Sequence, residues 1–283
     1  MQKQKQQLLP ISIKTAFEEL CNKHQLLTCG IEKIDSILKL NLCDRLAVTG
    51  NKKYSQMFVT RLCVNALLSS SSSKKNSSKL VASSRVHTSN LIPVDAGNST
   101  DFYQYVNFAR QYYRRDVISR VLNNTIITRS FTVYQLADLV INQLPKVIQQ
   151  YKAKMIVISD LLDMFIRDPQ IEGNEARYLI NEIVKSITKS KALEDLLVVV
   201  SIAYEHGAYR HHHNNKPALQ YNKTILPRFD KCIEIMNSHD DRNKMIDIKM
   251  RNNGTSNRNT TDDFHNHKKA SCSIKERDLL ILH

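Results

Sequence analysis

Residues 45–67 read RLAVTGNKKYSQMFVTRLCVNAL. The segment Arg45–Thr49 is short and mostly apolar or β-branched, as expected of a strand that is buried on both faces. From Phe58 to Leu67, apolar residues recur every three or four positions, which is the spacing of an amphipathic helix. A strand that enters a turn at Gly50 and leads into such a helix is the setting of a phosphate-binding loop. This stretch therefore predicts an α/β fold.

The turn itself lacks the residues that bind phosphate. In the pattern GxxxxGK[ST] counted from Gly50, the second glycine, the lysine and the hydroxyl residue fall on Ser55, Gln56 and Met57. These three positions normally let backbone amides turn inward, neutralise the β- and γ-phosphates and hold magnesium. The chain has only six glycines, where an average usage of about 7% predicts roughly twenty. No intact glycine-rich phosphate motif can therefore be present.

Two lysines follow the turn. Lys52 or Lys53 could still reach a phosphate, and the N-terminus of the following helix offers free N–H groups. A weak nucleotide pocket and a purely structural turn are both compatible with this pattern.

Strand-like and helix-like segments alternate along the chain to about residue 204. Expected strands are 45–49, 91–94, 125–129, 155–159 and 196–201, and expected helices are 101–113, 133–143 and 174–190. This alternation predicts a mostly parallel, twisted sheet flanked by helices. Further on, residues 231–236 and 244–250 predict an antiparallel hairpin at the sheet edge, and 279–282 a last strand.

The domain organisation follows from composition. We expect residues 1–25 to form a helical or partly disordered N-terminal segment, 26–251 a single core, and 252–283 a polar tail with a possible final strand. A serine- and lysine-rich stretch, 69–79, and an Asn-, Thr- and His-rich stretch, 251–269, are expected to be loops or disordered.

Charge limits the classes of partner. Forty-one Lys and Arg against 27 Asp and Glu give a net charge of +14, which favours a polyanion, nucleic acid first and an anionic membrane surface second. Plain solubility is the other explanation. Six cysteines form no CxxC pair, which indicates reduced thiols in a cytoplasmic protein. No apolar run approaches the ~20 residues of a membrane helix, and we expect no association with a membrane.

Histidines gather in two places, but their spacing fits no defined metal site. His206 precedes the triplet His211–His213, and His265 and His267 precede Cys272. Neither group stands on a predicted helix or finger. We expect no metal site.

A family resemblance rests on the order of several segments: Gly30–Leu38, Pro93–Ser99, Thr128–Phe131, Met155–Asp160 and Val198–Ala203. Together with the strand and turn at Gly50, they resemble the ATPase core of the RecA/RadA strand-exchange recombinases over roughly residues 26–251. Met155–Asp160, for example, resembles the Walker B strand. The resemblance implies a RecA-like P-loop NTPase core. For intact members it also implies ATP and magnesium as cofactors, and DNA and other recombinase subunits as partners.

The departures from this family concern catalysis. The glutamate that polarises the attacking water is replaced by Gly97, and the Walker B aspartate by Ser159. Asp160 follows one place later, and on a strand such a displacement turns a side chain to the other face. The asparagine and glutamine after the fifth strand fall on Ile202 and Ala203. ATP hydrolysis is therefore not expected.

What remains of a nucleotide pocket, by resemblance, is a vestigial set: Gly50, Lys52, Lys53, Ser55 and Asp160. The loop 167–177, with Arg167 and Arg177, corresponds to the first DNA-contacting loop of the family. Residues 205–223 correspond to the second and carry Arg210, His211 and Lys216 among tyrosines, a mixture that suits single-stranded nucleic acid. A polar loop with a chance basic bias is the alternative.

The sequence thus predicts a non-catalytic or weakly active recombinase paralog that acts in DNA recombination or repair. It would bind DNA, with single strands favoured, or an active RadA-type recombinase. Two alternatives stay open: an unorthodox ATPase that uses Lys52 or Lys53 with Asp160, and a KaiC-like regulatory scaffold. Phe17–Leu20 only partly matches the segment through which the family oligomerises.

Overall fold

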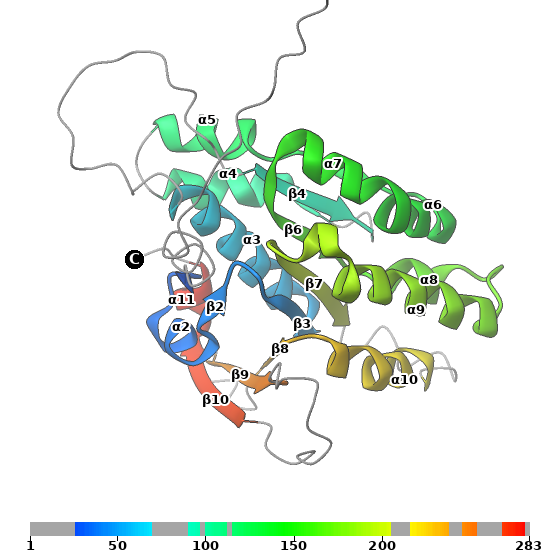
Figure 1. The fold of residues 1–283 in the computed structure, drawn as a ribbon. Helices are drawn as coiled ribbons and strands as arrows, with labels where there is room; N and C mark the ends of the chain where they lie inside the picture. The colour runs from blue at the N-terminus through cyan, green and yellow to red at the C-terminus, as the bar shows by residue number, and fades with distance from the viewer. Residues whose placement is uncertain are drawn as a thin grey trace, which may run out of the picture.

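The structure is a computed structural model that describes residues 26–69, 90–96, 100–111, 115–204, 216–237, 245–253 and 268–280. Its centre is an eight-stranded sheet (Figure 1). The strands are, in spatial order, β10 (Lys268–Lys275), β9 (Met245–Asn252), β8 (Lys231–Asn237), β3 (Arg45–Asn51), β7 (Leu197–Tyr204), β6 (Ala153–Ser159), β4 (Asn90–Asp95) and β5 (Thr128–Arg129). Two short strands, β1 (Leu26–Leu27) and β2 (Leu40–Asn41), pair separately.

Strand pairing confirms the predicted α/β class with a mostly parallel sheet. β3 is parallel to both β7 and β8, β6 to both β7 and β4, and β4 to β5. β9 is antiparallel to both of its neighbours, β8 and β10. The predicted hairpin therefore exists as β8 and β9, and a further strand lies outside it.

The C-terminal part of the chain differs from its prediction. The expected strand over residues 279–282 is wrong where the structure describes it, because Leu279 and Leu280 belong to helix α11 (Glu276–Leu280). The last strand is β10, within the segment that the sequence assigns to a polar tail. Ile274 is the one side chain of β10 that is fully buried among those described, so apolar alternation gave little sign of this strand.

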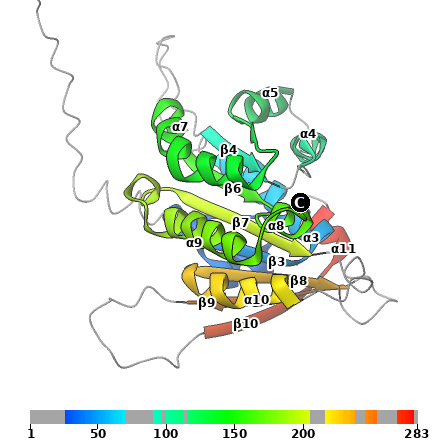
Figure 2. The same cartoon turned by 90° about the vertical axis from the view of Figure 1, so that its right-hand side faces the viewer.

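Helices cover both faces of the sheet (Figures 1 and 2). One apolar cluster packs the first face against α2 (Glu32–Leu38), α3 (Lys52–Ser69), α4 (Phe102–Arg110), α5 (Arg115–Asn123) and α11. The cluster on the other face includes α6 (Val133–Asp138), α7 (Leu144–Tyr151), α8 (Asp163–Arg167), α9 (Gly173–Lys189) and α10 (Lys216–Ile225). The helix predicted over 174–190 is confirmed as α9.

The helix that begins at Val133 does not stop near Pro145 as its pattern suggests. α6 continues through a π-helical turn, Leu139–Gln143, into α7. Pro145 lies in the first turn of α7, where its missing N–H costs little.

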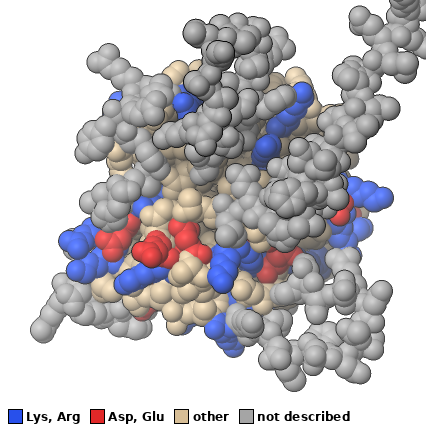
Figure 3. Space-filling view, turned by 60° about the vertical axis from the view of Figure 1, so that its left-hand side comes forward, with Lys and Arg blue, Asp and Glu red and all other residues tan. Residues whose placement is uncertain are grey.

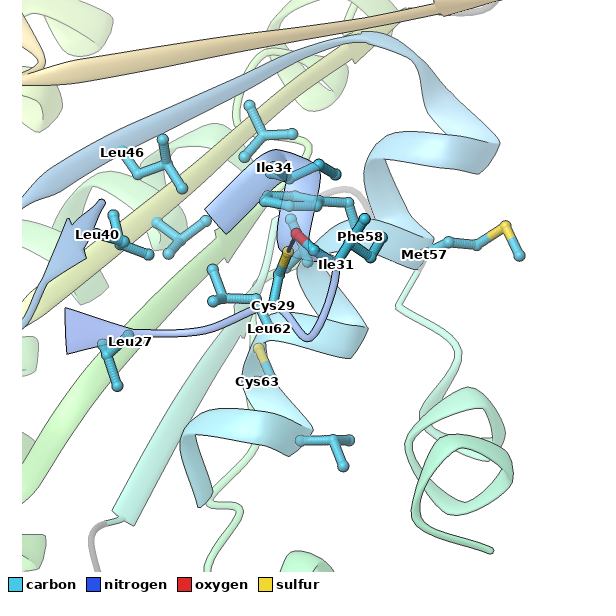
Figure 4. Packing of buried hydrophobic residues seen from close by; sticks show 14 of the residues in the cluster. Leu27, Cys29, Ile31, Ile34, Leu40, Leu46, Met57, Phe58, Leu62 and Cys63 are labelled. Carbon is cyan, nitrogen blue, oxygen red and sulfur yellow. Dashed lines mark hydrogen bonds between the residues drawn. The ribbon is translucent and has the colours of Figure 1, made fainter. Parts of the chain in front are cut away.

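Helix α3 is the centre of the first apolar cluster. Phe58 and Leu62 of this helix are fully buried and lie near Ile34 of α2 and Leu46 of β3 (Figure 4). Because each such side chain contributes roughly 1.5–3 kcal/mol when it is fully buried, this packing fixes α3 against the sheet.

A buried cation also holds α3 in place. The side chain of Arg61 is fully buried, and its guanidinium donates to the carbonyl oxygens of Cys29 at 2.7 Å and Gly30 at 2.8 Å. The same group donates to the carbonyl oxygen of Asp278 at 2.6 Å. Arg61 therefore joins the segment before α2 to helix α11.

Gly50 has a packing role. Its φ is +105°, and a Cβ at this position would lie 2.0 Å from the carbonyl oxygen of Ile235 on β8. Only glycine combines this backbone conformation with so close an approach. Nothing about phosphate binding is needed to explain it.

Among the helices of the described residues, none is long and apolar enough to cross a membrane.

Candidate functional site at the carboxyl edge of the sheet

Strand β3 runs directly into helix α3. Asn51 is the last strand residue and Lys52 the first helical one. The Asn51 side chain accepts a hydrogen bond from the backbone N–H of Tyr54 at 3.2 Å, as a helix cap does. Ser55 is buried and donates to the carbonyl oxygen of Thr49 at 3.2 Å. Side chains of the turn therefore form hydrogen bonds with some of its own backbone groups. Because α3 starts directly after β3, no loop of several residues is left to surround a phosphate.

Lys52 and Asp160, both predicted from the sequence, lie together. The Nζ of Lys52 is 3.5 Å from Oδ2 of Asp160, and their side chains are 16% and 1% exposed. Gln56, one turn further along α3, donates to the same Oδ2 at 3.2 Å. Ser201 of β7 donates to Oδ1 at 3.3 Å and accepts from the backbone N–H of Asp160 at 2.8 Å. One carboxylate therefore connects the ends of β3 and β6 with β7.

The backbone at Asp160 explains this geometry. β6 ends at Ser159, and Asp160 has a φ of +53° in the left-handed region. Strand alternation, which predicts that the carboxylate turns to the other face, does not apply beyond the end of the strand. The carboxylate instead lies against Lys52 and Gln56 of α3.

A second carboxylate adjoins this pair. Asp163, at the start of α8, forms an ion pair with Arg167 at 3.0 Å. Burial raises the pKa of Asp163, while the nearby Lys52 and Arg167 act in the opposite direction. Two cations and two carboxylates thus meet at this edge, and their formal charges cancel. A hollow of about 430 Å³ lies beside them, lined in part by Arg167, Asp163 and Phe131.

Lys53 lies elsewhere. Its Nζ is 2.9 Å from Oε1 of Glu276 on α11 and 5.3 Å from the centre of the Tyr54 ring. The hydrogen bond to Glu276 raises the pKa of Lys53. The structure brings Lys52 to Asp160 and pairs Lys53 with the C-terminal helix.

A neighbouring ion pair was not predicted. Asp95 ends β4 and is fully buried, and its Oδ2 is 3.1 Å from Nε of Arg129 on β5. The two residues are register partners in adjacent parallel strands. The signal in the sequence is a charged residue directly at the end of each strand, but their opposite charges can be paired only once the strand order is known.

The predicted DNA-binding residues are dispersed. Arg167 is paired with Asp163, Arg177 lies on α9, and Lys216 begins α10. Arg210, His211 and Gly97 lie outside the described residues.

The first predicted DNA loop, 167–177, has more acidic than basic side chains. Its carboxylates are Asp168, Glu172 and Glu175, against the two arginines already named. Glu175 also accepts a hydrogen bond from the hydroxyl of Tyr134 at 2.9 Å. This composition does not favour contact with a polyanion.

One face of the molecule shows no concentration of positive charge among the described residues. On the face in Figure 3, basic and acidic side chains of the described residues are interspersed.

The described residues contain no group of three His, Cys, Asp or Glu side chains arranged to hold a metal ion. Their five cysteines form no disulfide, and those at positions 29, 63 and 232 are buried. The histidine groups near residues 211 and 265 lie outside the described part of the chain.

Comparison with known proteins gives no family: no protein-family model matches the sequence, and no curated protein shows significant similarity to it.

Proposed function

We propose that this protein is a non-catalytic paralog of the RecA/RadA recombinases that acts in DNA recombination or repair by binding DNA or an active recombinase. The observation that carries the proposal is the ion pair between Lys52 and Asp160. It lies where an ATPase of that family would hold phosphate and magnesium.

The position of the pair follows from the topology. In open parallel sheets, ligands bind beyond the carboxyl ends of the strands, where successive connections leave in opposite directions. β3 connects through α3 toward β4 on one side, while β7 connects through α10 to β8 on the other. The end of β3 is such a point, and the chain's own side chains fill it.

Displacing this pair is costly for a ligand. Asp160 is 1% exposed and has contacts with Lys52, Gln56 and Ser201. Separating the partners of a buried ion pair typically costs about 3–5 kcal/mol, and a phosphate that took Lys52 would also approach the Asp160 carboxylate. This supports a binding role without ATP turnover.

The same observation favours the second candidate, an unorthodox ATPase, because it places a lysine and an aspartate of the predicted pocket side by side. In that case the pair would open when magnesium and nucleotide arrive, with Asp160 holding the metal and Lys52 a phosphate. The two candidates differ in turnover.

The test measures three quantities on the full chain: magnesium-dependent ATP hydrolysis, binding of a labelled oligonucleotide over a salt series, and association with a purified RadA-type recombinase. Lys52→Ala is compared with Lys185→Ala, which removes an exposed lysine paired only with Glu182 on α9. We expect that the wild type, Lys52→Ala and Lys185→Ala all hydrolyse ATP only at the background rate. We also expect all three proteins to bind DNA or the recombinase. If the wild type and Lys185→Ala hydrolyse ATP and Lys52→Ala does not, the protein is the unorthodox ATPase instead. If the wild type binds neither DNA nor the recombinase, the proposal of a recombinase paralog is refuted.

A further inference from the structure

A groove of about 730 Å³ lies between α10 and the antiparallel end of the sheet. Its cationic lining residues are Lys223 on α10, Lys249 and Arg251 on β9, and Lys269 on β10. Among the described residues that line it, Glu234 of β8 is the one acidic residue. The formal charge of this lining is therefore strongly positive, unlike that of the carboxyl edge.

The groove exists because β9 and β10 have one apolar and one polar face. Ile246, Ile248 and Met250 of β9 are buried in the cluster beneath α2 and α3. Lys249 and Arg251 alternate with them and so point to the opposite face. On that face the helical layer ends with α10, which leaves a step between the helix and the polar strands (Figure 2).

Strand register brings the cations close together. Arg251 is the direct cross-strand partner of Lys269, and Lys249 lies between Glu234 and Ser271. Direct partners have Cβ atoms about 4.5–5.5 Å apart, and like charges at such positions destabilise a sheet. A bound anion removes this repulsion.

These cations have no partners within the described part of the chain. The side chains of Lys223, Lys249, Arg251 and Lys269 form no ion pair or hydrogen bond there, whereas Lys231, on the other face of β8, is paired with Asp44 at 2.7 Å. The lining also includes Asn222, whose amide oxygen is buried and has no hydrogen-bond partner among the described residues. Rotating this amide by half a turn would present its N–H group to a ligand oxygen.

We propose that this groove binds the phosphodiester backbone of a nucleic acid strand. The inference rests on the proposed DNA-binding function and assigns it to a surface. Lys249 and Arg251 are two residues apart on one strand, about 7 Å, so the groove offers cations in succession along its length. Cations from three elements suit a chain of phosphates better than one phosphate group.

The lining also predicts the mode of recognition. Besides its polar side chains, the groove is lined by Leu226, Pro227, Cys232, Met250 and Ala270, and no aromatic residue lines it among those that the structure describes. Stacking of bases on aromatic rings, which is common in single-strand binding, is therefore not available within it. The groove contacts phosphates and not bases. Its affinity for nucleic acid is therefore independent of base sequence and sensitive to salt.

The test uses the full chain and a fluorescently labelled oligo-dT, with binding followed by anisotropy over a potassium chloride series. The groove variant is Lys249→Gln/Arg251→Gln/Lys269→Gln, whose replaced side chains are exposed. The control variant, Lys146→Gln/Lys154→Gln/Lys191→Gln, removes the same charge from exposed positions elsewhere. Circular dichroism checks that both variants fold.

The slope of log K against log salt is negative, and each contact on a single strand contributes about −0.7, so the loss of three phosphate contacts makes the slope less steep by about 2. We expect this change, and at least tenfold weaker binding at low salt, in the groove variant and not in the control. Oligo-dA must bind like oligo-dT.

Three outcomes overturn the proposal. If the groove variant and the control bind DNA as the wild type does, the groove is not the site, although DNA binding stands. If poly-glutamate competes as well as DNA of equal charge, the groove takes an acidic protein segment. If the wild type binds no DNA, the groove assignment fails, and association with the recombinase alone decides the proposed function.

Discussion

The ammonium group of Lys52 lies 3.5 Å from the carboxylate of Asp160, so the first residue of α3 is tied to the residue that follows β6. Lys52→Met leaves this carboxylate buried without its cation. Because the lysine is partly exposed, we expect a loss of about 2 kcal/mol in the free energy of unfolding, measured in urea. Lys53→Met serves as the control: this lysine is 64% exposed, and its partner Glu276 keeps a hydrogen bond with Tyr54, so we expect a cost below about 1 kcal/mol. Equal losses would contradict the special role of Lys52.

Removing the buried cation Arg61 should destabilise the fold strongly. In Arg61→Met the carbonyl oxygens of Cys29, Gly30 and Asp278 lose a donor. We expect a loss of about 3 kcal/mol, because buried acceptors without a partner cost about 1–3 kcal/mol each and only part of them regain water. Arg277→Met, at a position that is 70% exposed, changes stability by less than about 0.5 kcal/mol. A similar change in both variants, in chemical denaturation, would refute the prediction.

Two glycines give opposite predictions for alanine. Gly50→Ala places a methyl group 2.0 Å from the Ile235 carbonyl oxygen in a left-handed backbone, and we expect a loss above about 3 kcal/mol. Gly173→Ala, at the first residue of α9, meets nothing within 4 Å and should gain up to about 1 kcal/mol. Thermal unfolding of both variants is the measurement. A tolerated Gly50→Ala would show that β3 and β8 can separate there.

The raised pKa of Asp163 predicts a pH dependence. The folded protein holds the proton of this carboxyl more tightly than the unfolded chain, whose value is about 3.9. Its contribution to stability is therefore present below about pH 3.9 and is lost as the pH rises through the higher folded value. Compared with the wild type, Asp163→Asn should lack this decline.

The measurement for Asp163 is urea unfolding between about pH 3 and 7. Asp138→Asn is the control, because hydrogen bonds from Asn142 and Gln143 lower the pKa of Asp138. The effect of this control on the pH profile should have the opposite sign. Identical profiles for the wild type and Asp163→Asn would contradict the assignment.

The sequence was sufficient for the parts of the fold that depend on local patterns. The apolar run at Arg45–Thr49 and the helical spacing after it identified β3 and α3, and Asn174–Ser190 identified α9. Lys52 and Asp160 were named through the resemblance to the RecA/RadA core, and in the structure each directly follows a strand of the sheet.

The rest depends on where distant segments meet. The partner of Lys53 is Glu276 on α11, a helix that the sequence did not predict. The repulsive pair of Arg251 and Lys269 likewise requires β10, whose polar sequence resembles a loop. For the same reason the cationic groove could not be recognised from the net charge alone.

Arg61 has a consequence for how the protein folds as it is synthesised. Two of its acceptors, Cys29 and Gly30, leave the ribosome before it, but the carbonyl of Asp278 follows 217 residues later. Until then, a charged side chain in the apolar interior lacks part of its hydrogen bonding. A nascent chain without α11 should therefore be protease-sensitive around α3, and the final closure of the core should occur after most of the sheet has been translated.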